Sequence, residues 1–230
     1  MPQTAADLAR TLAANRAVGG VTLAVRASSG LTRRARVRED GSLRVRCPGP
    51  PSAELEAVIV NTAGGVAGGD RLMFDITVEA GARLLVTTAA AEKVYRTLEA
   101  AASIELTLRV GAGSSLAWLP QETILFDRAR LKRAIDVDLA EDARLLLAEA
   151  IVFGRAGMGE AVNEALLFDR WRLRRGGQLV HAEATRLDGA VASKLAKPAV
   201  ANGGIAVATV LVVPGDETAA AGVRALGEQL

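Results

Sequence analysis

Hydrophobic and polar residues alternate along most of the chain, in short runs that end at Gly, Pro or Ser. The clearest run is Arg130–Leu139, which becomes strictly alternating after Ala134, as expected for a strand with one buried face. Other alternating or apolar runs predict strands at 21–26, 31–38, 43–47, 55–61, 72–79, 83–88, 103–110, 115–119, 144–153, 164–174, 179–187 and 204–213. The pattern therefore predicts an all-β protein with a few short helices.

Helical spacing occurs in three places. Residues 89–97 form one short helix candidate near Tyr95. Residues 1–16 form another, and the N-terminal segment 1–18 is expected to be frayed. The best candidate is 216–230, where Asp216 can cap a helix in which Ala, Val and Leu follow at helical spacing.

A weak internal repeat lies within the predicted strands. Val78-Glu-Ala-Gly-Ala-Arg-Leu-Leu-Val resembles Val110-Gly-Ala-Gly-Ser-Ser-Leu-Ala-Trp and Leu139-Ala-Glu-Asp-Ala-Arg-Leu-Leu-Leu, with starts 32 and 29 residues apart. Each unit predicts a strand, a tight turn and a second strand. A repeat of this length is typical of a β-solenoid, whose rungs stack on one another, although three ordinary hairpins would give the same pattern. Nothing marks a domain boundary, so residues 1–230 are interpreted as one domain.

Composition restricts the chemistry. The 230 residues include one cysteine, Cys47, and one histidine, His181. A disulfide framework and a zinc site of Cys/His type are therefore excluded within one chain, and any histidine-dependent catalysis has to use His181. A metal held by one chain would be held mostly by oxygen atoms. Cys47 and His181 are each interpreted first as packing residues.

Charge is spread unevenly. Residues 1–52 hold nine arginines against three carboxylates, a net charge of +6, and the remainder is net negative. A basic surface can contact an acidic protein or nucleic acid, or it can be a solvated strand face. Aromatic residues are 3% of the chain and none interrupts the basic run, so nucleic acid is not an expected partner. No apolar run reaches membrane-spanning length, so we expect no membrane partner and a cytoplasmic location in which Cys47 stays reduced.

The densest motif is Asn61-Thr-Ala-Gly-Gly-Val-Ala-Gly-Gly-Asp70. It lacks the Gly-Lys-Ser/Thr ending of a phosphate-binding loop, and a strand follows where a helix would be needed. The glycines are therefore interpreted first as a structural crossover. Asp70 either accepts hydrogen bonds from loop N–H groups or offers its oxygens to a cation.

Three further segments carry polar residues among apolar ones. Pro120 interrupts a strand, and Gln121 and Glu122 follow at the bend. Glu149 and Glu183 each lie inside an apolar strand, where a carboxylate needs an arginine partner, water or an ion. His181 falls on the same strand face as Glu183.

Several of these segments, in order, resemble the UreD (UreH) family of urease accessory proteins. The resemblance covers roughly residues 20–190. It is carried by Asn61-Thr-Ala-Gly-Gly-Val-Ala-Gly-Gly-Asp-Arg71, Thr87-Thr-Ala-Ala-Ala-Glu-Lys-Val-Tyr-Arg96, Trp118-Leu-Pro-Gln-Glu-Thr-Ile-Leu-Phe-Asp127, Glu149-Ala-Ile-Val-Phe-Gly-Arg-Ala-Gly-Met-Gly-Glu160 and Gly41-Ser-Leu-Arg-Val-Arg46. Cys47 stands where the family pattern has Phe.

The resemblance implies a β-helix-like superhelix and a role without catalysis. A protein of this kind binds apo-urease, is a scaffold for UreF and the GTPase UreG, and passes nickel along a polar internal tunnel. By motif position, Asp70, Glu183 and Glu149 are the candidate nickel-path residues, with no tightly bound cofactor. The family's longer C-terminal tail is not visible here, so we expect an exposed edge at 205–213.

Two other functions remain open from the residues alone. One is a β-helix carbohydrate-active enzyme with a carboxylate and arginine site, although such sites need aromatic platforms. The other is a binding module that uses the basic residues 26–46. Nickel prefers imidazole and thiolate ligands, so the scarcity of both argues against a nickel store and is compatible with a transient nickel path.

Overall fold

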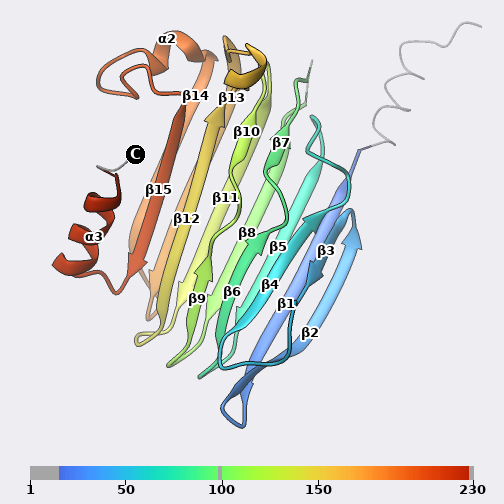
Figure 1. Ribbon diagram of the computed structural model, residues 1–230, viewed down its shortest axis with the longest axis vertical. Coiled ribbons are helices and arrows are strands. Elements are labelled where there is room, and N and C mark those ends of the chain that lie inside the picture. Colours follow the sequence, from blue (N-terminus) through green and yellow to red (C-terminus); the bar gives the residue numbers. More distant parts are fainter. Residues whose placement is uncertain (1–15, 98–99, 228–230) are drawn as a thin grey trace, which may run out of the picture.

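The fold is a β-solenoid built from two facing sheets (Figure 1). The computed structural model describes residues 16–97 and 100–227. Within them, the first sheet has the strand order β14-β13-β11-β8-β5-β1-β2, and the second has the order β3-β4-β6-β9-β12-β10-β7, with β15 beside β12. The first sheet comprises β1 (Val18–Ser28), β2 (Leu31–Gly41), β5 (Arg71–Val78), β8 (Ala102–Val110), β11 (Arg130–Leu139), β13 (Glu164–Arg175) and β14 (Gln178–Ala190).

The second sheet is built from shorter strands that face the first. It comprises β3 (Leu43–Arg46), β4 (Leu55–Asn61), β6 (Arg83–Thr88), β7 (Glu92–Val94), β9 (Ser115–Trp118), β10 (Thr123–Leu125), β12 (Arg144–Phe153) and β15 (Ala206–Val213). Two helices follow late in the chain, α2 (Val191–Leu195) and α3 (Glu217–Gly227). The solenoid and the predominance of strands confirm the fold class predicted from the sequence.

The rungs stack in parallel and keep their register. Val78 is paired with Val110, and Val110 with Leu139, which are the starting residues of the three repeat units. The strands after the turns are also in register, since Arg83 pairs with Ser115 and Ser115 with Arg144. The internal repeat therefore corresponds to solenoid rungs, and the alternative of three hairpins was wrong.

The core lies between the sheets because alternate side chains of every rung point inward. One inward row crosses the first sheet from Val21 to Trp171 by way of Phe74, Leu106 and Ile135, and all of these side chains are buried. A matching row in the second sheet is formed by Leu84, Leu116 and Leu145.

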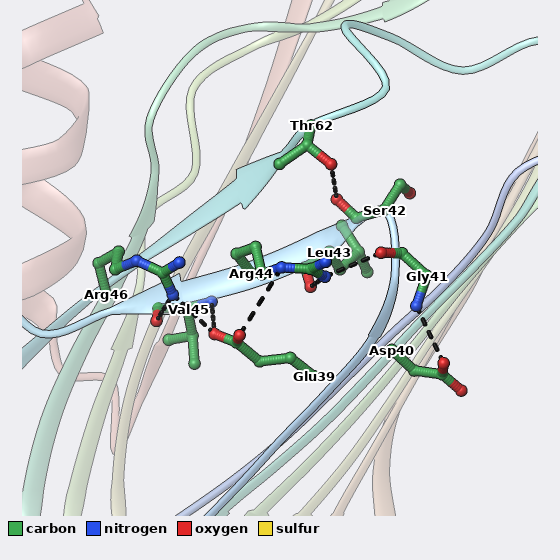
Figure 2. A network of polar contacts seen from close by, with 9 residues as sticks. All are labelled: Glu39, Asp40, Gly41, Ser42, Leu43, Arg44, Val45, Arg46 and Thr62. Atoms are coloured by element: carbon green, nitrogen blue, oxygen red, sulfur yellow. Dashed lines mark hydrogen bonds and ion pairs between the residues drawn. The ribbon is translucent and has the colours of Figure 1, made fainter.

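Antiparallel strands flank the parallel rungs at both ends. β2 and β3 lie at one end, and β14 and β15 at the other (Figure 1). At the first end a carboxylate on β2 joins the two sheets: Glu39 accepts hydrogen bonds from the N–H of Val45 at 2.7 Å and from Arg46 at 2.8 Å (Figure 2). The Val45 N–H, together with Arg46, holds the pKa of Glu39 below its usual range.

The opposite end also has exposed strands. β15 pairs with β12, and Ile205, Val207 and Val210 are exposed, as expected for this edge. On β14, the residues that face the same side as buried Trp171 and Leu173 are His181 and Glu183, and neither is buried.

Two helix predictions had opposite outcomes. The helix at 216–230 is confirmed as α3 over its described part, and the Asp216 side chain accepts a hydrogen bond from the N–H of Ala219 at 2.7 Å. The helix at 89–97 was wrong, because Glu92–Val94 forms the parallel strand β7 against β10. Pairing with a neighbouring rung overrides local helical spacing there. The helix expected at 1–16 lies outside the described residues, apart from its last position.

Candidate functional site

Four side chains from four different strands form a buried polar group, here called the Arg133 cluster: Trp118, Arg133, Glu149 and Asp169. Arg133 donates two hydrogen bonds to Asp169, from Nε to Oδ1 at 3.0 Å and from Nη2 to Oδ2 at 2.6 Å, and a third from Nη1 to Glu149. Trp118 Nε1 donates to the other carboxylate oxygen of Glu149 at 2.8 Å. Because Arg133 pairs with Asp169 across two adjacent rungs and Glu149 faces them from the second sheet, the cluster joins the two layers.

The Arg133 cluster carries a net charge of −1 in the core. Its three charged side chains are 4–7% exposed. Burial alone would disfavour the guanidinium, but Glu149 and Asp169 outweigh that cost and hold the pKa of Arg133 above its usual range. The arginine therefore stays charged, and each carboxylate keeps a charged hydrogen-bond donor.

This geometry answers the question that the sequence left open for Glu149. The carboxylate has an arginine partner, and both of its oxygens accept hydrogen bonds. A cation at Glu149 would have to displace Arg133 or Trp118. The same cluster holds the carboxylates and arginine that a carbohydrate-active enzyme would need, but it is sealed between the sheets and is not in an open cleft.

A second polar group lies at the glycine-rich loop and is called the Asp70 cluster: buried Asp70 and the half-buried Asn61 and Glu92. Asp70 is 4% exposed. Its Oδ1 accepts the N–H of Ala17 at 2.8 Å and its Oδ2 accepts the N–H of Ala67 at 2.7 Å. Of the two roles predicted for Asp70, the structure thus shows the first, in which the carboxylate satisfies backbone N–H groups.

Two glycines of the loop, Gly65 and Gly68, are needed because the next rung approaches closely. A Cβ on Gly68 would lie 2.0 Å from Thr97 Oγ1 and 2.5 Å from the carbonyl oxygen of Ala100. A Cβ on Gly65 would lie 2.5 Å from the Tyr95 ring. The loop is the structural crossover that the sequence favoured.

Glu92 was not singled out by the sequence. Asn61 Nδ2 lies 3.1 Å from both of its carboxylate oxygens, and the two side chains line a cavity of about 180 Å³ together with Thr88 and Lys93. Burial is the main cause that holds the pKa of Glu92 above its usual range, and nearby Asp70 acts in the same direction. The missed signal is that a glutamate occupies a short inner strand, which was misread as a helix.

Glu183 is the most accessible of the three predicted path residues. Its side chain is 48% exposed, and its Oε2 lies 3.8 Å from Nε2 of His181 on the same strand face, as predicted. Gln121 and Glu122 act at the bend through their backbone: the N–H of Gln121 donates to Thr88 Oγ1, and the carbonyl of Glu122 accepts the N–H of Glu92.

Asp70, Glu149 and Glu183 lie in three separate environments. In residues 16–97 and 100–227, no group of three His, Cys, Asp or Glu side chains is placed to hold a metal ion. Cys47, whose thiol has a pKa raised by burial, is partly buried against the core. The part of the chain that the structure describes also contains no helix long and apolar enough to cross a membrane.

Comparison with known proteins decides the family. The model of the UreD urease accessory protein family matches residues 17–230. The chain belongs to the UreD urease accessory protein family. It is 58% identical to the urease accessory protein UreD of Rhodopseudomonas palustris strain CGA009 over 213 residues, which are 93% of this chain and 76% of that protein. It is 55% identical to the UreD protein of Bradyrhizobium diazoefficiens over 94% of this chain and 78% of that protein.

Family membership confirms the resemblance found in the sequence motifs and supports a role in urease maturation. The accessory-protein family name points to a maturation factor and not to a catalyst. The glycine-rich loop, which carries much of the resemblance, has a structural explanation of its own in the close packing of successive rungs.

Proposed function

We propose that the protein is a cytoplasmic, non-catalytic urease maturation factor that binds apo-urease, recruits UreF and the GTPase UreG, and gives nickel a transient path. The observation that carries the proposal is the family match over residues 17–230, with relatives more than half identical that are named as urease accessory proteins. Nickel is cargo in this role and not a resident cofactor.

The polar groups support a path of weak contacts. Oxygen donors predominate, and carboxylates occur between the sheets at the Asp70 and Arg133 clusters and at the exposed β14 strand. Weak oxygen contacts let an ion enter and leave, whereas imidazole and thiolate ligands would retain it.

The three path residues are not equivalent in this proposal. Asp70 and Glu149 already accept two hydrogen bonds each, so binding an ion there costs existing interactions. Glu183 is exposed and can bind a cation without losing a buried hydrogen bond. Glu183 is therefore the first residue to test for nickel transfer.

The partner proposal is tested by co-expression with UreF, UreG and the apo-urease subunits, followed by affinity purification. A complex that contains all of these proteins is the expected result. Failure of this chain to co-purify with UreF or with apo-urease would overturn the scaffold role.

The nickel proposal is tested with Glu183→Gln, and Glu56→Gln, at an exposed position of β4, is the matched control. We expect both variants to assemble normally, and urease matured with Glu183→Gln to contain less nickel by metal analysis. Equal nickel content in urease matured with the two variants would exclude Glu183 from the path.

A further inference from the structure

The outer face of the first sheet carries cross-strand ion pairs. In each, an arginine of one rung reaches an aspartate of the preceding rung: Arg109 to Asp75 at 2.6 Å, Arg170 to Asp136 at 2.6 Å and Arg174 to Asp138 at 4.0 Å. Opposite charges on neighbouring strands stabilise a sheet modestly. Arg109, Arg170 and Arg174 on these central rungs are thus paired within the protein itself.

The β1–β2 end of the same sheet breaks this pattern. Arg26 on β1 is paired in register with Arg33 on β2, so two like charges lie directly opposite each other. Arg36 and Arg38 follow on the same outer face of β2, whereas Arg34 pairs with Val25 and lies on the other face; all of these side chains are exposed. Among the described residues, no carboxylate oxygen lies within 4 Å of any of the five arginines. Like charges directly opposite each other destabilise a sheet, and no ion pair among the described residues offsets the Arg26–Arg33 contact.

The nearby acidic residue does not supply that compensation. The carboxylate of Glu39 turns toward β3, where it accepts hydrogen bonds from Val45 and Arg46 and lies 3.8 Å from Arg44 (Figure 2). Asp40 accepts the N–H of Gly41. Arg33, Arg36 and Arg38 therefore remain a positive row on the outer face of β2, with Arg34 on its other face.

β2 is also a sheet edge. It pairs with β1 on one side, and near its start Thr32 donates its N–H to the carbonyl of Ser52. From Arg33 onward, the described residues supply no strand on its other side. A charged edge discourages pairing with a neutral strand, but the same charges attract a strand of opposite charge.

We propose that β2 from Arg33 to Arg38 is a docking edge for an acidic protein segment, which adds to the sheet as a further strand. Such a segment would pair its backbone with the free edge of β2 and place carboxylates at alternate positions, about 7 Å apart, beside the arginines. Nucleic acid could bind the arginine side chains but could not form hydrogen bonds with the backbone of β2 as a further strand would. This surface also has no aromatic side chain for base stacking. The acidic character of the partner is inferred from the arginines of β2 alone. The inference therefore does not depend on the proposed role in urease maturation.

The test uses the full chain and a short labelled peptide of alternating Glu and Thr, with binding followed by fluorescence anisotropy over a series of salt concentrations. We expect measurable binding that weakens as salt rises. The triple variant Arg33→Gln/Arg36→Gln/Arg38→Gln should bind about tenfold more weakly or worse, because each exposed ion pair contributes up to about 1 kcal/mol. The matched control is Arg83→Gln/Arg144→Gln/Arg172→Gln, which removes three exposed arginines elsewhere. It should bind within about twofold of the parent protein.

Two further probes separate strand addition from general attraction. The same peptide with alternate backbone amides methylated cannot form a ladder, so it should bind far more weakly. A short DNA duplex should bind more weakly than the Glu–Thr peptide. Four outcomes would each overturn the proposal. The two triple variants could lose peptide binding equally, or the methylated peptide could bind as tightly as the unmodified one. The DNA duplex could bind more tightly than the peptide, or the peptide could fail to bind at low salt.

Discussion

The carboxylates of the Arg133 cluster and the carboxylate of Asp70 are buried to a similar extent but are neutralised in different ways. Both Glu149 and Asp169 are held by the guanidinium of Arg133, and Glu149 also by the indole of Trp118, from other strands. Asp70 is held by two backbone N–H groups, one from its own loop and one from Ala17. The first cluster connects rungs across both sheets, whereas the second fixes a loop and the approach to β1.

This difference predicts how each cluster fails. A buried ion pair is costly to break because removal of one partner leaves the other charge unpaired. A carboxylate that caps N–H groups leaves neutral donors when it is removed, and these donors cost less. The Arg133 cluster should therefore be the more sensitive of the two.

The largest effect is expected for Arg133→Met. It leaves Glu149 and Asp169 as buried unpaired carboxylates, so we expect a loss of about 3–5 kcal/mol in the free energy of unfolding, measured by urea denaturation. The triple variant Arg133→Met/Glu149→Gln/Asp169→Asn removes the uncompensated charges and should recover part of that loss. A loss below about 1 kcal/mol for Arg133→Met would contradict the picture of a sealed charged cluster.

Asp70→Ala should have the next largest effect. It leaves the N–H groups of Ala17 and Ala67 without their acceptor, at a cost of about 2–4 kcal/mol for the two donors. Asp70→Asn keeps one acceptor oxygen and should lose less. Thermal unfolding of both variants checks the order, and equal losses would show that carboxylate charge matters more than hydrogen bonding.

Gly68→Ala tests whether the loop of the Asp70 cluster is fixed by close packing. Its methyl group would contact Thr97 and the carbonyl of Ala100, so we expect a loss of about 1–3 kcal/mol. Gly157→Ala is the control, since no atom lies within 4 Å of the added Cβ. Urea denaturation should separate the two variants; if they are equally stable, the glycines of the loop are not required by packing.

The smallest effect concerns Glu92. Burial raises its pKa in the folded protein, so its contribution to stability is fully present below the unfolded pKa and is lost as the pH rises through the folded pKa. Glu92→Gln removes this dependence and should be slightly more stable at neutral pH, by less than about 1 kcal/mol. Unfolding free energies of both proteins across that pH window provide the measurement. Parallel curves would show that Glu92 does not titrate differently in the folded state.

The sequence predicted the fold well because the rungs alternate cleanly and each repeat unit ends in a turn. Arg130–Leu139 and Arg144–Phe153 were placed as strands from their own patterns. The short strands at Glu92–Val94 and Thr123–Leu125 were missed. Three residues are too few to show an alternation of hydrophobic and polar side chains, and these segments become strands because they pair with a neighbouring rung.

The candidate site was less predictable. The sequence indicated that Glu149 needs a partner but could not choose Arg133 among 24 arginines, because that choice depends on which rungs stack and which sheet faces them. For Asp70 the sequence allowed either hydrogen bonds to backbone N–H groups or contact with a cation, and only the structure shows the hydrogen bonds. The placement of Glu183 beside His181 on one strand face followed directly from alternation.

Because the rungs share one register, the distance across the first sheet is a whole number of strand spacings. Asp70 directly precedes β5 and Glu183 lies on β14, and four strand spacings separate these strands in the first sheet. At about 4.8 Å for each spacing, the two strands lie roughly 19 Å apart across the sheet. Since paired rungs keep their alignment, evolution can lengthen or shorten this span in whole strand spacings without disturbing the inward rows. Glu183 is in register with Phe74, four residues along the chain from Asp70, so the distance between the two carboxylates is set by the count of rungs together with this offset along the strands.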